Sequence, residues 1–138
     1  MAEVAVSETL ATLSTLASSG AKGLLPTAVG QRFEALQAVV RASGPLALVG
    51  SRVAKALDDL REHQRLRNFL CHGFSEVSAD SLGVWQMTLS LTSFRAGTIE
   101  RSSMQINAVE AALLLEKLRS ARLRLDGQLR GMLASLAR

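Results

Sequence analysis

The chain changes its periodicity within the stretch Arg67-Asn68-Phe69-Leu70-Cys71-His72-Gly73. Before this stretch, apolar residues recur every three or four positions, which is typical of helices that cover a core. After it, apolar and polar residues alternate over positions 85–91, which is typical of a half-buried strand. Glycine is the residue type that most often follows the last residue of a helix. The sequence therefore predicts a helix that ends at residue 72, followed by β-structure.

Working outward, the pattern predicts helices over about residues 3–19, 27–42 and 46–72, with a loop at 20–26. Ser43-Gly44-Pro45 is a break that places a proline at the first turn of the third helix. Residues 85–91 and 98–106 predict two strands, joined by a turn at 92–97. Asn107 and Glu110 resemble a capping box for a last helix that reaches about Leu136.

These elements predict a single mainly α domain over residues 1–138. Its expected architecture is a bundle of about four helices, with a two-stranded β-hairpin inserted before the last helix. With 138 residues and 48% hydrophobic composition, the chain is long enough to bury a core.

The charge of the chain is basic, with a formal net charge of +4, and thirteen of its sixteen basic residues are arginine. Arginine makes bidentate contacts with phosphate, so this bias favours a nucleic-acid partner, although a GC-rich coding sequence produces the same bias. Aromatic and basic residues do not interleave along the sequence, so no base-stacking platform is expected. The sequence shows no signal peptide and no apolar run long enough for a membrane span, and its one cysteine suits a reducing compartment. We therefore expect a cytoplasmic protein that makes no membrane contact.

The predicted third helix carries the candidate functional residues. On an ideal helix, Arg61, Arg65, Asn68 and His72 lie within one stripe, whereas Arg67 lies in the adjoining apolar arc among leucines. A cation in an apolar arc is costly unless it is paired or faces a cleft. Either Arg67 opens into a functional cleft, or its side chain reaches water or an acidic partner such as Glu8, Glu34 or Asp58.

Histidine is the side chain whose ordinary chemistry suits proton transfer near neutral pH, and His72 is one of two in the chain. Arg67 and His72 lie about 140° apart around an ideal helix and about 7.5 Å apart along it. They converge on one ligand only if the helix unwinds at residues 71–73 or if two chains each supply a pair. Arg65 lies on the same face as His72 and is the alternative functional arginine.

The chain resembles the HEPN superfamily in three features. An asparagine follows the arginine, a histidine stands five positions after the arginine, and the predicted helix ends at that histidine. Members of the superfamily are small helical bundles with an R-x4-6-H motif, which Arg67, Asn68 and His72 match here. The resemblance implies a homodimer whose two motifs line one groove. It also implies a metal-independent endoribonuclease or RNA-binding effector, as in toxin–antitoxin and defence systems. The alternative within the same family is a catalytically silent adaptor that binds a protein or nucleotide.

In the enzymatic case, His72 would act as general acid or base on the ribose, and Arg67 would stabilise the phosphorane. Cleavage would leave a 2′,3′-cyclic phosphate and a 5′-hydroxyl. Asn68 and Arg65 would support the site, and Arg61 and Arg65 would contact RNA. An antitoxin or regulatory protein is an expected further partner. Some HEPN toxins have a modifiable tyrosine two residues after the histidine; Phe74 stands there in this chain.

No cofactor is expected. Two histidines and one cysteine without ligand spacing predict no zinc site, so no metal is expected either. Without the resemblance, the remaining reading is a plain helical dimerisation module.

Overall fold

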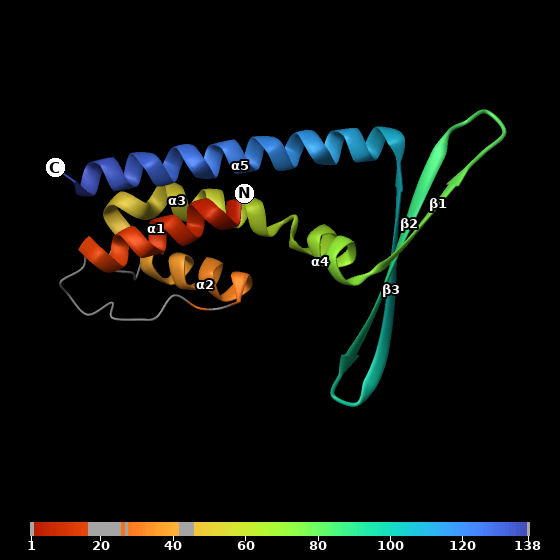
Figure 1. Ribbon diagram of the computed structural model, residues 1–138, viewed down its shortest axis with the longest axis horizontal. Coiled ribbons are helices and arrows are strands. Elements are labelled where there is room, and N and C mark those ends of the chain that lie inside the picture. The colour runs from red at the N-terminus through yellow and green to blue at the C-terminus, as the bar shows by residue number, and fades with distance from the viewer. Residues whose placement is uncertain (1, 17–25, 27, 42–45, 138) are drawn as a thin grey trace. The chain divides into compact units, whose positions relative to one another are not determined.

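The computed structural model describes residues 2–16, 26, 28–41 and 46–137. The predicted loop at 20–26, apart from Pro26, lies outside the described residues, as do the break at 43–45 and the ends of the first two predicted helices at 17–19, 27 and 42. The described residues form five helices and three strands (Figure 1). They divide into two compact units, one comprising residues 1–60 and 120–138 and the other residues 61–119.

The first unit is helical. It contains α1 (Ala2–Leu16), α2 (Val29–Val40), α3 (Ala47–Arg61, apart from its last residue) and the C-terminal part of α5 (Ala108–Leu136). Apolar residues at helical spacing on all four helices meet in one core. Its most deeply buried members are Val6, Leu36, Val40, Val53, Leu57 and Leu125.

The second unit combines α4 (Gln64–His72), an antiparallel sheet and the first part of α5. The sheet has the order β1-β2-β3, formed by β1 (Phe74–Ala79), β2 (Trp85–Arg95) and β3 (Thr98–Asn107). Leu66 and Phe69 of α4 pack with Leu89 and Ile106 of the sheet in a second core. This core covers only the face of the sheet from which Met87, Leu89 and Leu91 project.

The prediction of a mainly helical fold is confirmed, and the alternation at residues 85–91 does form a strand. The predicted hairpin is present as β2 and β3, but the prediction of only two strands was wrong, because β1 adds a third. All six residues of β1 are exposed and only Val77 is β-branched, so the segment carries no burial pattern. It is nevertheless a strand because it pairs with residues 85–90 of β2 in continuous register.

The prediction of one helix over 46–72 was also wrong, because the helix is interrupted at Glu62 and His63. Neither glycine nor proline marks the interruption. Leu57 belongs to the core of the first unit and Leu66 to the core of the second, so the two segments bury their apolar faces in different places. The number of helices therefore rises from about four to five among the described residues.

The capping box at the start of α5 is confirmed. The backbone N–H of Glu110 donates to Asn107 Oδ1, and the backbone N–H of Asn107 donates to Glu110 Oε2, both at 2.9 Å. These reciprocal bonds satisfy donors that the first turn of a helix leaves free. They fix where the last strand ends and the long helix begins.

Candidate functional site

The candidate residues Arg65, Arg67, Asn68 and His72 all lie on α4, a helix of nine residues. Arg61 is the last residue of α3 and precedes the interruption, so it does not share a continuous helical stripe with them. The predicted stripe is therefore shortened to Arg65, Asn68 and His72. These three residues are spaced three and four positions apart, which places them on one face of α4.

The interruption also changes the environment of Arg67. Leu66 and Phe69 are buried, whereas Arg67 is exposed and Leu70 is 55% exposed. The expectation that Arg67 lies in an apolar arc among leucines was wrong, because Arg67 and the neighbouring Leu70 are both exposed. The apolar arc assumed one continuous helix over residues 46–72. Because α4 is a separate helix, its buried face is formed by Leu66 and Phe69. Arg67 consequently reaches solvent without a desolvation cost.

Arg65 and His72 are exposed, and Asn68 is half-buried. The guanidinium of Arg65 lies 5.8 Å from the centre of the Phe69 ring, within the range of a cation–π contact. Phe69 itself is 2% exposed and anchors α4 to the sheet. Arg65 therefore lies over the Phe69 ring, on the face of α4 that also carries His72.

α4 remains helical through His72, which excludes unwinding at this residue as the way to bring Arg67 and His72 together. On a regular helix their side chains leave the axis about 140° apart. One chain thus presents Arg67 on one side of α4, and Asn68 and His72 on another. Of the two arrangements considered from the sequence, the one that remains is a pair of chains that each supply an arginine and a histidine.

Gly73 follows α4, as predicted, but for a different physical reason. Its φ of −92° and ψ of 173° are extended backbone that any residue adopts, not the left-handed conformation of a typical helix end. A Cβ at this position would lie 2.7 Å from the carbonyl oxygen of Ser90 and would also collide with that of Phe69. Glycine is needed here because helix, strand and connecting residue approach closely.

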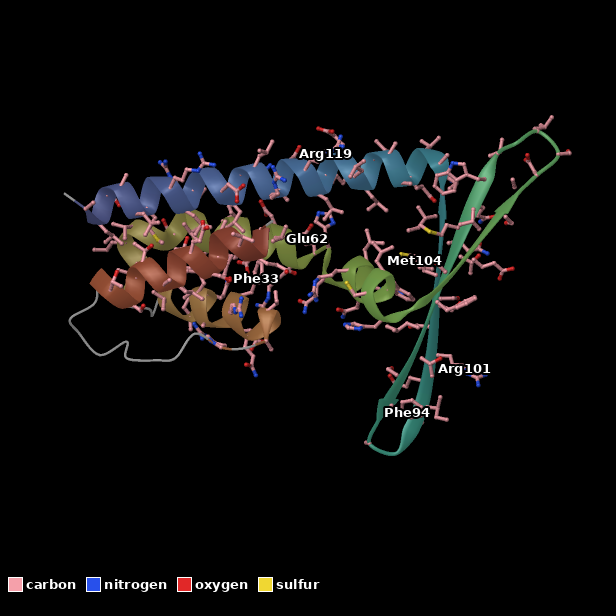
Figure 2. The ribbon with its side chains drawn as sticks, in the orientation of Figure 1. Phe33, Glu62, Phe94, Arg101, Met104 and Arg119 are labelled. Atoms are coloured by element: carbon pink, nitrogen blue, oxygen red, sulfur yellow. The ribbon has the colours of Figure 1, made fainter. Side chains whose placement is uncertain are left out.

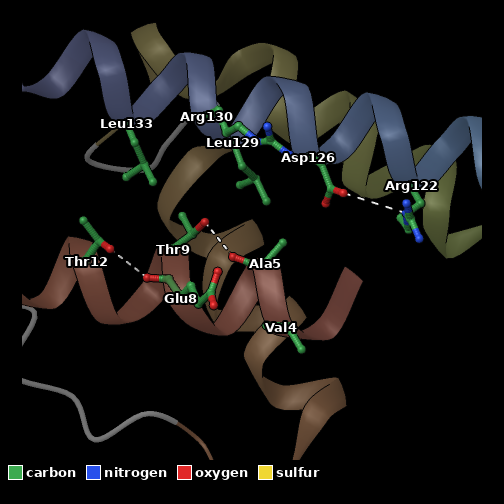
Figure 3. Close-up of a pocket in the computed structure, with 10 residues that line it drawn as sticks. All are labelled: Val4, Ala5, Glu8, Thr9, Thr12, Arg122, Asp126, Leu129, Arg130 and Leu133. Carbon is green, nitrogen blue, oxygen red and sulfur yellow. Dashed lines mark hydrogen bonds and ion pairs between the residues drawn. The ribbon is translucent and has the colours of Figure 1, made fainter. Parts of the chain in front are cut away.

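A separate hollow of about 440 Å³ lies between α1 and α5 in the first unit (Figure 3). Glu8 and Thr12 line it from α1, and Arg122, Asp126 and Arg130 from α5. Arg122 Nε lies 3.8 Å from Asp126 Oδ2, so acidic and basic groups on α5 neutralise each other locally. None of the motif residues contributes to this hollow, and its mixed charge favours no particular ligand.

Among the described residues, no three histidine, cysteine, aspartate or glutamate side chains gather as ligands of a metal ion would. None of the described helices is long and apolar enough to cross a membrane. Comparisons with protein-family models, with curated proteins and with solved structures gave no match.

Proposed function

We propose that the chain acts on RNA as a metal-independent endoribonuclease of HEPN type, with Arg67 and His72 as its catalytic pair in a homodimer. The observation that carries the proposal is the exposure of both side chains on a short helix whose buried face they do not share. Residues that serve only packing would lie on the buried face. An exposed arginine and an exposed histidine on one short helix, with a half-buried asparagine beside them, suit phosphate binding and proton transfer.

The roles follow from the chemistry of RNA cleavage by its own 2′-hydroxyl. His72 takes the proton from that hydroxyl or gives one to the departing 5′ oxygen, which contributes about 10²–10⁴-fold in rate. Arg67 stabilises the extra negative charge on the phosphorane. Asn68, one turn before His72, orients the imidazole or donates to a phosphate oxygen. Arg65 supports the site as a fixed cation beside it.

Because Arg67 and His72 leave α4 in different directions, each site in the proposed dimer takes Arg67 from one chain and His72 from its partner. A two-fold axis that brings the α4 helices together generates two such sites in one groove. The charge at each site is then supplied by both chains, which makes dimerisation a requirement for activity.

The test is cleavage of mixed structured and unstructured RNA in EDTA by the wild type, His72→Ala and Arg67→Ala. We expect cyclic-phosphate ends from the wild type and loss of cleavage in both variants, at unchanged helical content and mass. An equal mixture of the two inactive variants, after exchange of subunits, should recover about a quarter of the wild-type activity, because half of the dimers then hold one intact composite site.

Arg52→Ala serves as the control, since Arg52 is an exposed arginine on α3 and belongs to the other compact unit. Cleavage that survives His72→Ala would contradict the proposal, as would a folded wild type that cuts no RNA. In the second case, binding of a nucleotide or protein without cleavage would favour the silent adaptor. If His72→Ala and Arg67→Ala each kept activity, and their mixture were no more active than either alone, a site shared between two chains would be excluded.

A further inference from the structure

The face of the sheet that points away from the core of the second unit carries two exposed phenylalanines. Leu89 faces that core, and Phe94, five residues further along β2, projects from the opposite face. Phe74 of β1 pairs with Ser90 of β2, which places it on the same outer face as Phe94. Phe74 is 72% exposed and Phe94 is 79% exposed. The second unit therefore holds two aromatic rings in water on one side of a sheet.

Arg101 lies between the two rings. The pairing of β2 with β3 sets Ser90 opposite Ser103, Thr92 opposite Arg101, and Phe94 opposite Ile99. Cross-strand rows on one face are about 6.7 Å apart along the strands, so the rows of Phe74 and Phe94 are about 13 Å apart, and the row of Arg101 lies midway. Figure 2 shows Phe94 and Arg101 towards the tip of the β2–β3 hairpin.

The three rows contain one formal charge, the guanidinium of Arg101, which is exposed. Their remaining side chains are Ser90, Thr92, Ser103 and Ile99. The nearest acid on this face is Glu76, one row beyond Phe74 on β1. The face from Phe74 to Phe94 is thus positive, rich in hydroxyl groups, and interrupted by polar side chains between its rings.

We propose that this outer face binds single-stranded RNA, with bases stacked on Phe74 and Phe94 and a phosphate at Arg101. Single-stranded RNA is recognised chiefly by stacking of unpaired bases on aromatic side chains, and open sheets are a common platform for it. A surface that docks a protein centres on a contiguous apolar patch, whereas Thr92 and Arg101 separate these rings. The choice of RNA as the polymer rests on the proposed function.

This arrangement is produced by strand register and not by the linear sequence. Phe74, Phe94 and Arg101 come from three different strands, and no local stretch combines an aromatic with a basic residue in an alternating pattern. The missed strand β1 supplies the first ring. The expectation that the chain lacks a stacking platform followed from reading the sequence along its length only.

The test is the binding of a fluorescent 2′-fluoro oligouridine of about 12 nucleotides, a length that covers one such face and offers no 2′-hydroxyl for cleavage. Fluorescence anisotropy then measures the dissociation constant on the uncut strand. We expect Phe74→Ala and Phe94→Ala each to raise it about 5- to 150-fold, the effect of losing one stacked base. Phe94→Trp should keep the affinity. Leu82→Ala is the matched control, because Leu82 is 86% exposed in the turn between β1 and β2.

Salt dependence separates the role of Arg101 from those of the rings. Arg101→Gln should reduce the slope of log affinity against log salt by about 0.7, the value for one phosphate contact on a single strand. Phe94→Ala should leave the slope unchanged. Arg52→Gln removes the same charge from α3 and should not change the slope.

Three results would overturn the inference. The first is a wild type that does not bind the oligouridine, and the second is an equal loss of affinity in Leu82→Ala and Phe94→Ala. The third is the conversion of a dimer to a monomer by Phe94→Ala. The last would make this face a contact between copies of the chain. The outcome is independent of cleavage. A chain that binds through both rings but cuts no RNA would contradict only the proposed function, and a nuclease indifferent to both rings would contradict only this inference.

Discussion

Replacement of Gly73 by alanine is the sharpest test of how the candidate site is held. The dihedral angles of Gly73 are open to any residue, so the substitution strains no torsion. The added methyl group would instead lie 2.7 Å from the carbonyl oxygen of Ser90, closer than the 3.0 Å limit that real Cβ atoms respect. Phe69, whose carbonyl oxygen also obstructs the methyl group, accepts the 2.9 Å bond from the backbone N–H of Gly73.

Both obstacles are backbone atoms, so no side chain can rotate away to relieve the contact. Either the last turn of α4 opens, which loses the bond from Gly73 N–H to Phe69, or the start of β1 moves off β2. Overpacking of this kind costs about 1–3 kcal/mol, and loss of a hydrogen bond adds about 1 kcal/mol. We therefore expect Gly73→Ala to lower the free energy of unfolding by about 2–4 kcal/mol.

The assay is urea unfolding followed by the fluorescence of Trp85, the one tryptophan, which lies on β2 in the affected unit. With a slope of about 2 kcal/mol per molar urea, the midpoint should fall by about 1–2 M. Gly127→Ala is the matched control, because Gly127 is an exposed glycine within α5 whose added Cβ would meet nothing within 4 Å. Alanine there should stabilise α5 by about 0.5–1 kcal/mol. A Gly73→Ala midpoint equal to or above that of the wild type would refute the steric argument.

Three further predictions concern the stability of a helix cap, a turn and the helical core. Asn107→Ala should cost about 1 kcal/mol in urea unfolding, because it removes the side-chain cap of Glu110 N–H, and Asn107→Ser should recover most of that loss. Ala96 has a φ of 48° in the turn between β2 and β3, so Ala96→Gly should raise the hydrogen-exchange protection of that hairpin by about 1 kcal/mol; unchanged or lower protection would be contrary to the turn geometry. Leu125 is fully buried in the helical core, so Leu125→Ala should cost about 2.7–5 kcal/mol by circular dichroism melting, whereas a loss below 1 kcal/mol would contradict its burial.

The parts of the fold that the sequence predicted are those in which one local signal is sufficient. The alternation at 85–91 and the Asn107–Glu110 pair each concern neighbouring residues, and both are present in the structure. The missed features depend on distant residues. β1 is a strand because β2 offers it hydrogen bonds, and α3 separates from α4 because two cores compete for their leucines. Periodicity carries no information on either choice.

The sequence predicted that the motif residues lie on a helix, but not how exposed they are. The motif identified Arg67, Asn68 and His72, and they do lie together on one helix. The burial of Arg67 was misjudged because its neighbours were assigned from one continuous helix. Strand pairing also creates a face that no motif describes, because only the register of the strands places Phe74, Phe94 and Arg101 on the same side of the sheet.

Gly73 links the proposed catalytic helix to the proposed RNA-binding face. His72 ends α4 and Phe74 begins β1, so only one residue separates the proposed proton-transfer group from the first ring of the outer face. Two residues of extended chain span at most about 7 Å, which is of the order of one row of the sheet. A base stacked on Phe74 would therefore bring its ribose and phosphate close to the end of α4. Since the close approach of Gly73 to Ser90 fixes the start of β1 against β2, this glycine would also set the distance between the proposed RNA-binding face and the proposed catalytic histidine.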